Sequence, residues 1–164
     1  MNQKVKMTND LNEELDGYYM QLVYIQDIIS VEEDMNKYPQ MKSTPNFTLI
    51  TKCALSDAYM IALMRLYDDS KQAKTIPNLI KKCKDNKNLF LHPEQVAEQL
   101  DSFANELNTD DFIKQAINVI HIRRDSIYAH NDKKYFGNKI TNDKSYFKKY
   151  HISFIVRYTK KVLV

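Results

Sequence analysis

Residues 111–136 read DFIKQAINVIHIRRDSIYAHNDKKYF, and their hydrophobic pattern decides the predicted fold. Isoleucines recur at the spacing of one helix face, at Ile113, Ile117, Ile120 and Ile127. Arg124 occupies the missing position of this stripe, between the last two isoleucines. The pattern therefore predicts a helix over residues 111–131 that carries a charge on its apolar face.

A charge on an apolar helix face has two interpretations. Burying a charge is costly unless it is paired or functional, so Arg124 and the adjacent Arg123 are candidate site residues. The alternative is structural, in which both arginines cap the helix C-terminus or pair with carboxylates on neighbouring helices. His130 lies in the same row of the helix as Arg123, which places a second functional side chain on this edge.

The order of Arg124, Asp125 and His130 resembles the R-[N/D/H]-x(n)-H signature of the HEPN superfamily, in which four to six residues separate the arginine from the histidine. Five residues, DSIYA, separate them in this chain. The wording RDSIYAHND is similar to the AbiU-type, abortive-infection branch of the superfamily. The resemblance extends to residues 66–70 (LYDDS) and 75–79 (TIPNL), which look like the end of one family helix and the start of the next.

The same residue types suit the cleavage of RNA. RNA carries its own nucleophile, the 2′-hydroxyl, so a catalyst needs a proton carrier and a cation that stabilises the charged phosphorane. Histidine, with an unperturbed pKa of about 6.5, is the proton carrier expected at His130. Arg124 would hold the phosphate, while Asp125 orients the guanidinium or tunes the histidine and Asn131 holds a phosphate or ribose oxygen. The resemblance implies this reaction, metal-independent endoribonucleolysis that leaves a 2′,3′-cyclic phosphate and a 5′-hydroxyl.

The spacing raises one geometric difficulty. In an ideal helix Arg124 and His130 point about 120° apart around the axis, so they cannot share a face. Either the helix loosens after Tyr128, or Arg123 contributes, or the partner arginine comes from another subunit. We expect a homodimer in which residues 111–131 of two chains meet across a two-fold axis, which is similar to the dimeric sites of the family.

Composition predicts an all-α fold. The 164 residues include two glycines and no tryptophan, which favours helices with few tight turns in one domain of residues 1–164, with residues 1–7 frayed. Further helices are expected from Thr8 or Asn9 to about Lys37, from Asn46 to Tyr67, from Thr75 to Lys84, from Pro93 onward, and from Ser145 to Val164. The second should be the most buried, because its apolar face is the widest. The last also alternates like a strand, but helical steps favour a helix. The predicted architecture is a HEPN-like antiparallel four-helix bundle with one or two short accessory helices.

Positive charge is concentrated at the C-terminal end. The basic segment, residues 133–164, holds nine Lys or Arg and one Asp, whereas the whole chain has a net charge of +3. Its lysines alternate with aromatic residues, a pattern that neutralises phosphates and stacks on bases. The candidate RNA-binding residues are Arg123, Asn131, Lys133, Lys134 and Lys139. The alternative is a solvated face held by salt bridges.

Several classes of protein are not expected. Cys53 and Cys83 are isolated, which points to a reducing cytoplasm. The four histidines show no metal-ligand spacing, so we expect neither a metal nor another cofactor. No apolar run approaches the length of a membrane span, so no membrane partner is expected.

Three function hypotheses remain in view. The first is a ribonuclease toxin or phage-defence effector that acts on RNA and has an antitoxin or another defence protein as partner. The second is a non-catalytic RNA-binding or protein-interaction module that retains the HEPN fold. A third hypothesis is silencing by a nucleotidyltransferase that modifies a tyrosine two residues after the histidine. Asp132 occupies that position, which argues against it.

Overall fold

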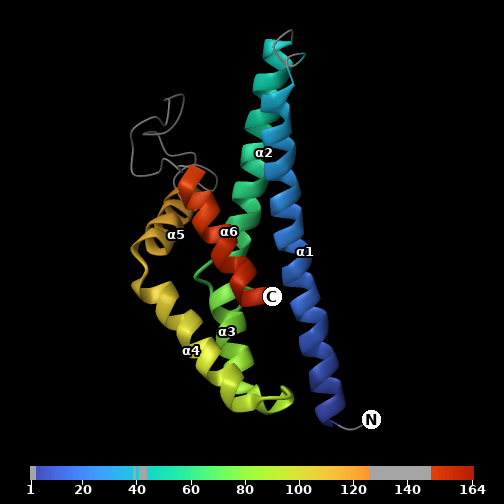
Figure 1. Cartoon of the computed structure of the whole chain (residues 1–164), viewed down its shortest axis with the longest axis vertical. Helices are drawn as coiled ribbons and strands as arrows, with labels where there is room; N and C mark the ends of the chain where they lie inside the picture. Colours follow the sequence, from blue (N-terminus) through green and yellow to red (C-terminus); the bar gives the residue numbers. More distant parts are fainter. Residues whose placement is uncertain (1–2, 39, 41–43, 126–148) are drawn as a thin grey trace.

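The computed structural model describes residues 3–38, 40, 44–125 and 149–164 of the chain. These residues form six α-helices, and no strand is present among them. The helices are α1 (Gln3–Lys37), α2 (Pro45–Leu66), α3 (Ile76–Asp85), α4 (Pro93–Thr109), α5 (Asp111–Arg123) and α6 (Lys149–Leu163), with the short 3₁₀ helix η2 (Lys87–Leu89) before α4 (Figure 1). The all-α, HEPN-like prediction is confirmed, and the last helix is a helix rather than a strand.

Local sequence signals set the starts of four helices. Pro45 and Pro93 lie in the first turns of α2 and α4, where a missing N–H removes no helical hydrogen bond. Thr75 caps α3, and Asp110 caps α5 by accepting from two backbone N–H groups at 2.8 and 3.0 Å. The helix α1 begins at Gln3, so the expected start of this helix at Thr8 or Asn9 is wrong.

The antiparallel pair α1 and α2 extends beyond the other helices (Figure 1). Six side chains of α2 between residues 59 and 66 lie in the core. In the half nearer the N-terminus of α2, Phe47, Leu49 and Ile50 are 61%, 63% and 68% exposed. The sequence predicts that α2 is the most buried helix. This prediction is wrong, because the N-terminal half of α2 is exposed. An apolar sequence indicates what a helix can bury, but the neighbouring helices determine where it does so.

By length and composition, α2 is also the one helix among the described residues that could cross a membrane. The expectation that no segment reaches that length is wrong by this criterion. Core helices of ordinary globular proteins meet the same criterion, and the C-terminal half of α2 is such a core segment. The length and composition of α2 are therefore not enough to identify it as a membrane-spanning helix.

Helix α6 lies among the others and packs against α1, α3 and α5 (Figure 1). The Thr159 hydroxyl donates to the carbonyl of Ile155 at 2.7 Å and lies 2.7 Å from the hydroxyl of Tyr67. Because a carbonyl only accepts, the single Thr159 proton is used there, and Tyr67 is the donor to Thr159. Both hydroxyls are buried, so this chain of hydrogen bonds fixes the end of α2 against α6.

Two isoleucines of the predicted stripe, Ile113 and Ile120, face the core of their own chain. Ile113 is 2% exposed and Ile120 is 0% exposed, as is Ala116 on the same side. These buried positions confirm the predicted helix face over the described part of α5. The homodimer itself stays a prediction.

Candidate functional site around Arg124

Helix α5 ends at two of the predicted site residues. The α-helix stops at Arg123 and continues as a π-helical turn at Arg124 and Asp125, with the Arg124 N–H shared between two carbonyls of the preceding turn. Such turns are rare and occur often at functional sites. The turn also departs from the ideal helix that the predicted angle between Arg124 and His130 assumes.

Arg124 lies between carboxylates from two separate parts of the chain. Its Nε donates to Asp125 Oδ1 at 2.7 Å, and its Nη1 donates to Asp69 Oδ1 at 2.8 Å. Nη2 donates to Asp125 Oδ2 at 3.4 Å, and Nη1 lies 3.3 Å from Asp68 Oδ1. We call Arg124, Asp68, Asp69 and Asp125 the Arg124 cluster. Since Asp68 and Asp69 directly follow α2, the cluster joins the ends of α2 and α5.

The Arg124 cluster holds three carboxylates and one guanidinium. The hydrogen bonds to Arg124 lower the pKa of Asp69 and of Asp125, and hydrogen bonds to Asp125 and Asp69 raise the pKa of Arg124. Among the described residues no group of three or more His, Cys, Asp or Glu is arranged to hold a metal ion. Arg124 is thus the cation of the cluster, and any phosphate must compete with the carboxylates for it.

The connection between α2 and α3 is held by its own hydrogen bonds. Asp68 Oδ1 accepts from the N–H of Ser70 at 2.8 Å. Asn78, in the first turn of α3, donates through Nδ2 to the carbonyls of Ser70 at 3.1 Å and Ala73 at 2.8 Å. These bonds shape the connection from both ends, so the position of Asp69 beside Arg124 is set by the local chain.

His121 lies one turn before Arg124 on the same side of α5. Its Nε2 is 2.7 Å from the carbonyl oxygen of Tyr67. Because that oxygen only accepts, Nε2 carries a proton, and Nδ1 is the acceptor of the neutral ring. Sequence reasoning considered His121 only as a metal ligand and missed this position. Its three-residue spacing from Arg124 was the one available signal.

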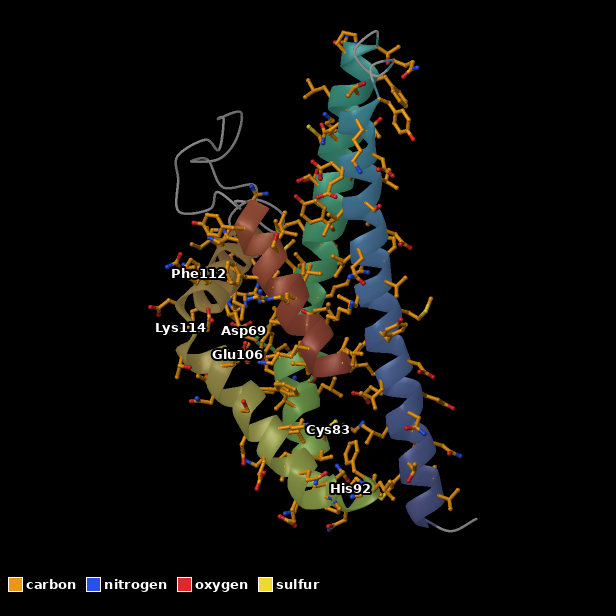
Figure 2. The ribbon with its side chains drawn as sticks, in the orientation of Figure 1. Asp69, Cys83, His92, Glu106, Phe112 and Lys114 are labelled. Carbon is orange, nitrogen blue, oxygen red and sulfur yellow. The ribbon has the colours of Figure 1, made fainter. Side chains whose placement is uncertain are left out.

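A cleft of about 420 Å³ opens beside the Arg124 cluster, and we call it the α5 cleft. Its walls come from the α2–α3 connection, the start of α3, the end of α4 and α5. Figure 2 labels Asp69 and Lys114, which line it from the α2–α3 connection and from α5. The Nζ of Lys114 pairs with Asp111 at 3.1 Å.

The structure brings two of the predicted site residues together. Arg124 and Asp125 are in direct contact. Burial raises the pKa of Tyr59 on α2, and the positive charge of Arg123 opposes that rise. The contacts of Arg124 match the structural alternative, pairing with carboxylates. The other predicted residues lie outside the described residues: His130, Asn131, Lys133, Lys134 and Lys139.

Comparison with protein families places this site in a known context. A model of the AbiU2 family of HEPN domains matches residues 5–157. The chain belongs to this family. The match covers the Arg124 cluster and nearly all of the helices, and it makes the chain an abortive-infection-type HEPN protein. No curated protein and no solved structure matches the chain.

Proposed function

We propose that this HEPN protein is a metal-independent endoribonuclease of a phage-defence or toxin system. The 2′-oxygen of a ribose attacks the adjacent phosphorus while the bond to the 5′-oxygen of the next nucleotide breaks. The products are a 2′,3′-cyclic phosphate and a 5′-hydroxyl. In this reaction His130 accepts the proton of the 2′-hydroxyl and returns it to the leaving oxygen, and Arg124 stabilises the charge that develops on the phosphorane.

The fixed guanidinium of Arg124 is the observation that carries the proposal. Asp125 and Asp69 hold the guanidinium from two directions. A guanidinium fixed in this way is preorganised to donate hydrogen bonds to phosphate oxygens. A guanidinium has five N–H hydrogens. The contacts found among the described residues engage Nε, Nη1 and one hydrogen of Nη2. The side chain is 26% exposed and therefore accessible to RNA.

The three carboxylates oppose a phosphate at this position. A phosphate gains from one cation and is repelled by three anions unless a carboxylate moves away. Asp69 is the best placed to move, because its side chain is 66% exposed while that of Asp68 is 33% exposed. We infer that a phosphate oxygen replaces Asp69 on Nη1, with Asp125 still orienting the guanidinium.

The basic segment supports RNA as the substrate. It begins three residues after His130 in the sequence, and part of it forms α6, where Lys160 is exposed. A high density of lysines close to His130 in the sequence is expected to attract a phosphate backbone regardless of base sequence.

A homodimer through the central helix is also part of the proposal. Since Ile113 and Ile120 are buried, such an interface would use the exposed residues of α5. Sedimentation equilibrium at micromolar concentration, with activity followed on dilution, tests it. A monomer that cleaves RNA at full specific activity would reject a site shared between two subunits.

The paired state of Arg124 favours a second candidate function. A guanidinium that is paired with carboxylates can serve as a structural ion pair. A HEPN domain without catalytic activity would retain this ion pair. Purified protein incubated with transfer RNA in EDTA separates the candidates. Cleavage supports the ribonuclease, and a gel shift without cleavage supports the RNA-binding module.

Matched substitutions test the assigned residues. Arg124→Ala and His130→Ala should each abolish cleavage, with helicity and melting temperature close to those of the wild type, because partly exposed ion pairs contribute little stability. Arg65→Ala and His92→Ala are the controls, because both side chains are exposed outside the Arg124 cluster. Wild-type cleavage rates in the first two variants would reject the assignment, and a collapse in melting temperature would favour a structural role.

A further inference from the structure

The α5 cleft has the construction of a small-molecule site. Its volume of about 420 Å³ lies within the range of about 300–1,000 Å³ found for ligand pockets. Pro77, Leu107 and Ile117 contribute apolar side chains to its lining. Apolar walls with a few polar groups suit a flat heterocycle better than a free phosphate.

The polar groups that line the cleft are mainly hydrogen-bond acceptors. Ionised Asp68 and Asp69 can only accept hydrogen bonds, and in the neutral ring of His121 the Nδ1 atom is an acceptor because Nε2 donates to the carbonyl of Tyr67. Asn78 spends both hydrogens of Nδ2 on two backbone carbonyls, so its Oδ1 remains as an acceptor. Lys114 is the one cation among the described residues of this lining and is paired with Asp111, so the carboxylates of Asp68 and Asp69 favour a ligand that presents N–H donors.

Among the four RNA bases, guanine matches these acceptors best. Its Watson–Crick edge presents N1–H and the N2 amino group side by side, which can donate to the two oxygens of one carboxylate. Adenine and cytosine each present one amino group on that edge, and uracil presents one imino N–H. Single-stranded RNA exposes this edge to proteins, so a base can enter the cleft without opening a duplex.

The cleft also adjoins the proposed phosphate position. Asp68 and Asp69 belong both to the cleft and to the Arg124 cluster, and His121 and Arg124 are three residues apart on α5. A base in the cleft therefore has its ribose and phosphate close to Arg124. We propose that the α5 cleft is a base-binding subsite that takes guanine next to the phosphate held at Arg124. This inference rests on the proposed function, but it concerns recognition rather than cleavage.

Oligonucleotides that cannot be cleaved test the subsite separately from catalysis. The probes are labelled single strands with 2′-O-methyl groups throughout, identical except for one G or one U, and fluorescence anisotropy gives their affinities. Since one bidentate contact to a base is worth about 1–3 kcal/mol of discrimination, the wild type should bind the G strand about fivefold or more tightly. Equal affinity for the two strands would overturn the proposal.

Two variants of α5 give the matched comparison. Asn118 lines the cleft and Gln115 does not, and both side chains are exposed on the same helix. Asn118→Phe should fill the cleft and remove the preference for G while leaving affinity for the U strand within about twofold of the wild type. Gln115→Phe should retain the preference. A G preference that survives in Asn118→Phe would also overturn the proposal.

The ring of His121 supplies an independent readout. Nitrogen-15 spectra of the wild-type protein should show Nε2 protonated and Nδ1 unprotonated, and the G strand should shift the Nδ1 signal while the U strand does not. A protonated Nδ1 in the neutral ring would contradict the acceptor role. Because these probes cannot be cut, a G preference without ribonuclease activity on natural RNA would support the cleft and reject the proposed activity. Ribonuclease activity without a G preference would support the proposed activity and reject the base-binding role of the cleft.

Discussion

Replacing Tyr67 with phenylalanine tests the junction that holds the end of α2, and with it Asp68 and Asp69, in place. Tyr67 is 2% exposed and Thr159 is 0% exposed, and their hydroxyls are 2.7 Å apart. Burial raises the pKa of Tyr67 well above its usual value, so the hydroxyl stays a donor throughout the pH range of the assay. The variant removes that donor and leaves the Thr159 oxygen buried without it.

The expected cost follows from this geometry. A buried hydrogen bond contributes about 0.5–1.5 kcal/mol, and a buried polar group left unsatisfied costs about 1–3 kcal/mol, so we expect Tyr67→Phe to lower the free energy of unfolding by about 1–2 kcal/mol. For a chain of this length, each kcal/mol shifts the melting temperature by about 2–4 °C. The hydrogen bond of His121 should persist, because it uses the backbone carbonyl of Tyr67.

Urea unfolding of a double-mutant cycle measures this bond directly. The cycle contains the wild type, Tyr67→Phe, Thr159→Val and the double variant. Removing both partners together leaves no orphaned hydroxyl, so the double variant should be less destabilised than the sum of the single variants by about 0.5–1.5 kcal/mol. Strictly additive effects, with unchanged m-values, would refute the reasoning that these hydroxyls form one buried chain.

Three further predictions concern the charges. Asp69→Asn should tighten RNA binding at low salt, measured by fluorescence anisotropy, and the gain should shrink as salt is added; an unchanged affinity would argue against displacement of Asp69 by phosphate. Because Arg124 lowers the pKa of Asp69 and Asp125, they contribute stability above their unfolded pKa that is lost as pH falls through their folded pKa. Arg124→Gln should therefore weaken the acid-induced loss of stability in urea titrations below about pH 5. Replacing three lysines of the basic segment with glutamine should flatten the salt dependence of single-strand binding by about 0.7 per lost phosphate contact, and an unchanged slope would assign them to a solvated face.

The helix boundaries could be predicted because their signals are local. Pro45, Pro93, Thr75 and Asp110 each start a helix within a few residues of their own position, and the periodicity of α5 identified its buried face. The exposure of half of α2 could not be predicted, because it depends on how far the neighbouring helices extend. A hydrophobic pattern carries no information on that length.

The candidate site could be predicted only in part. The signature identified Arg124 and Asp125, and the resemblance reached the segment containing Asp68 and Asp69 without indicating that they contact Arg124. That contact joins residues 55 positions apart and exists only in the folded chain. The role of His121 depends on a backbone carbonyl, which no side-chain pattern reveals.

The central claim is that Arg124 supports metal-free cleavage of RNA, and the chemistry of the new RNA ends tests it most directly. Purified protein is incubated with transfer RNA in EDTA, and the ends are identified by their reactivity with kinase and ligase. The account predicts 2′,3′-cyclic phosphate and 5′-hydroxyl ends with the wild type, and intact RNA with Arg124→Ala. Products with 5′-phosphate ends, cleavage that requires a divalent metal, or equal cleavage by Arg124→Ala would contradict it.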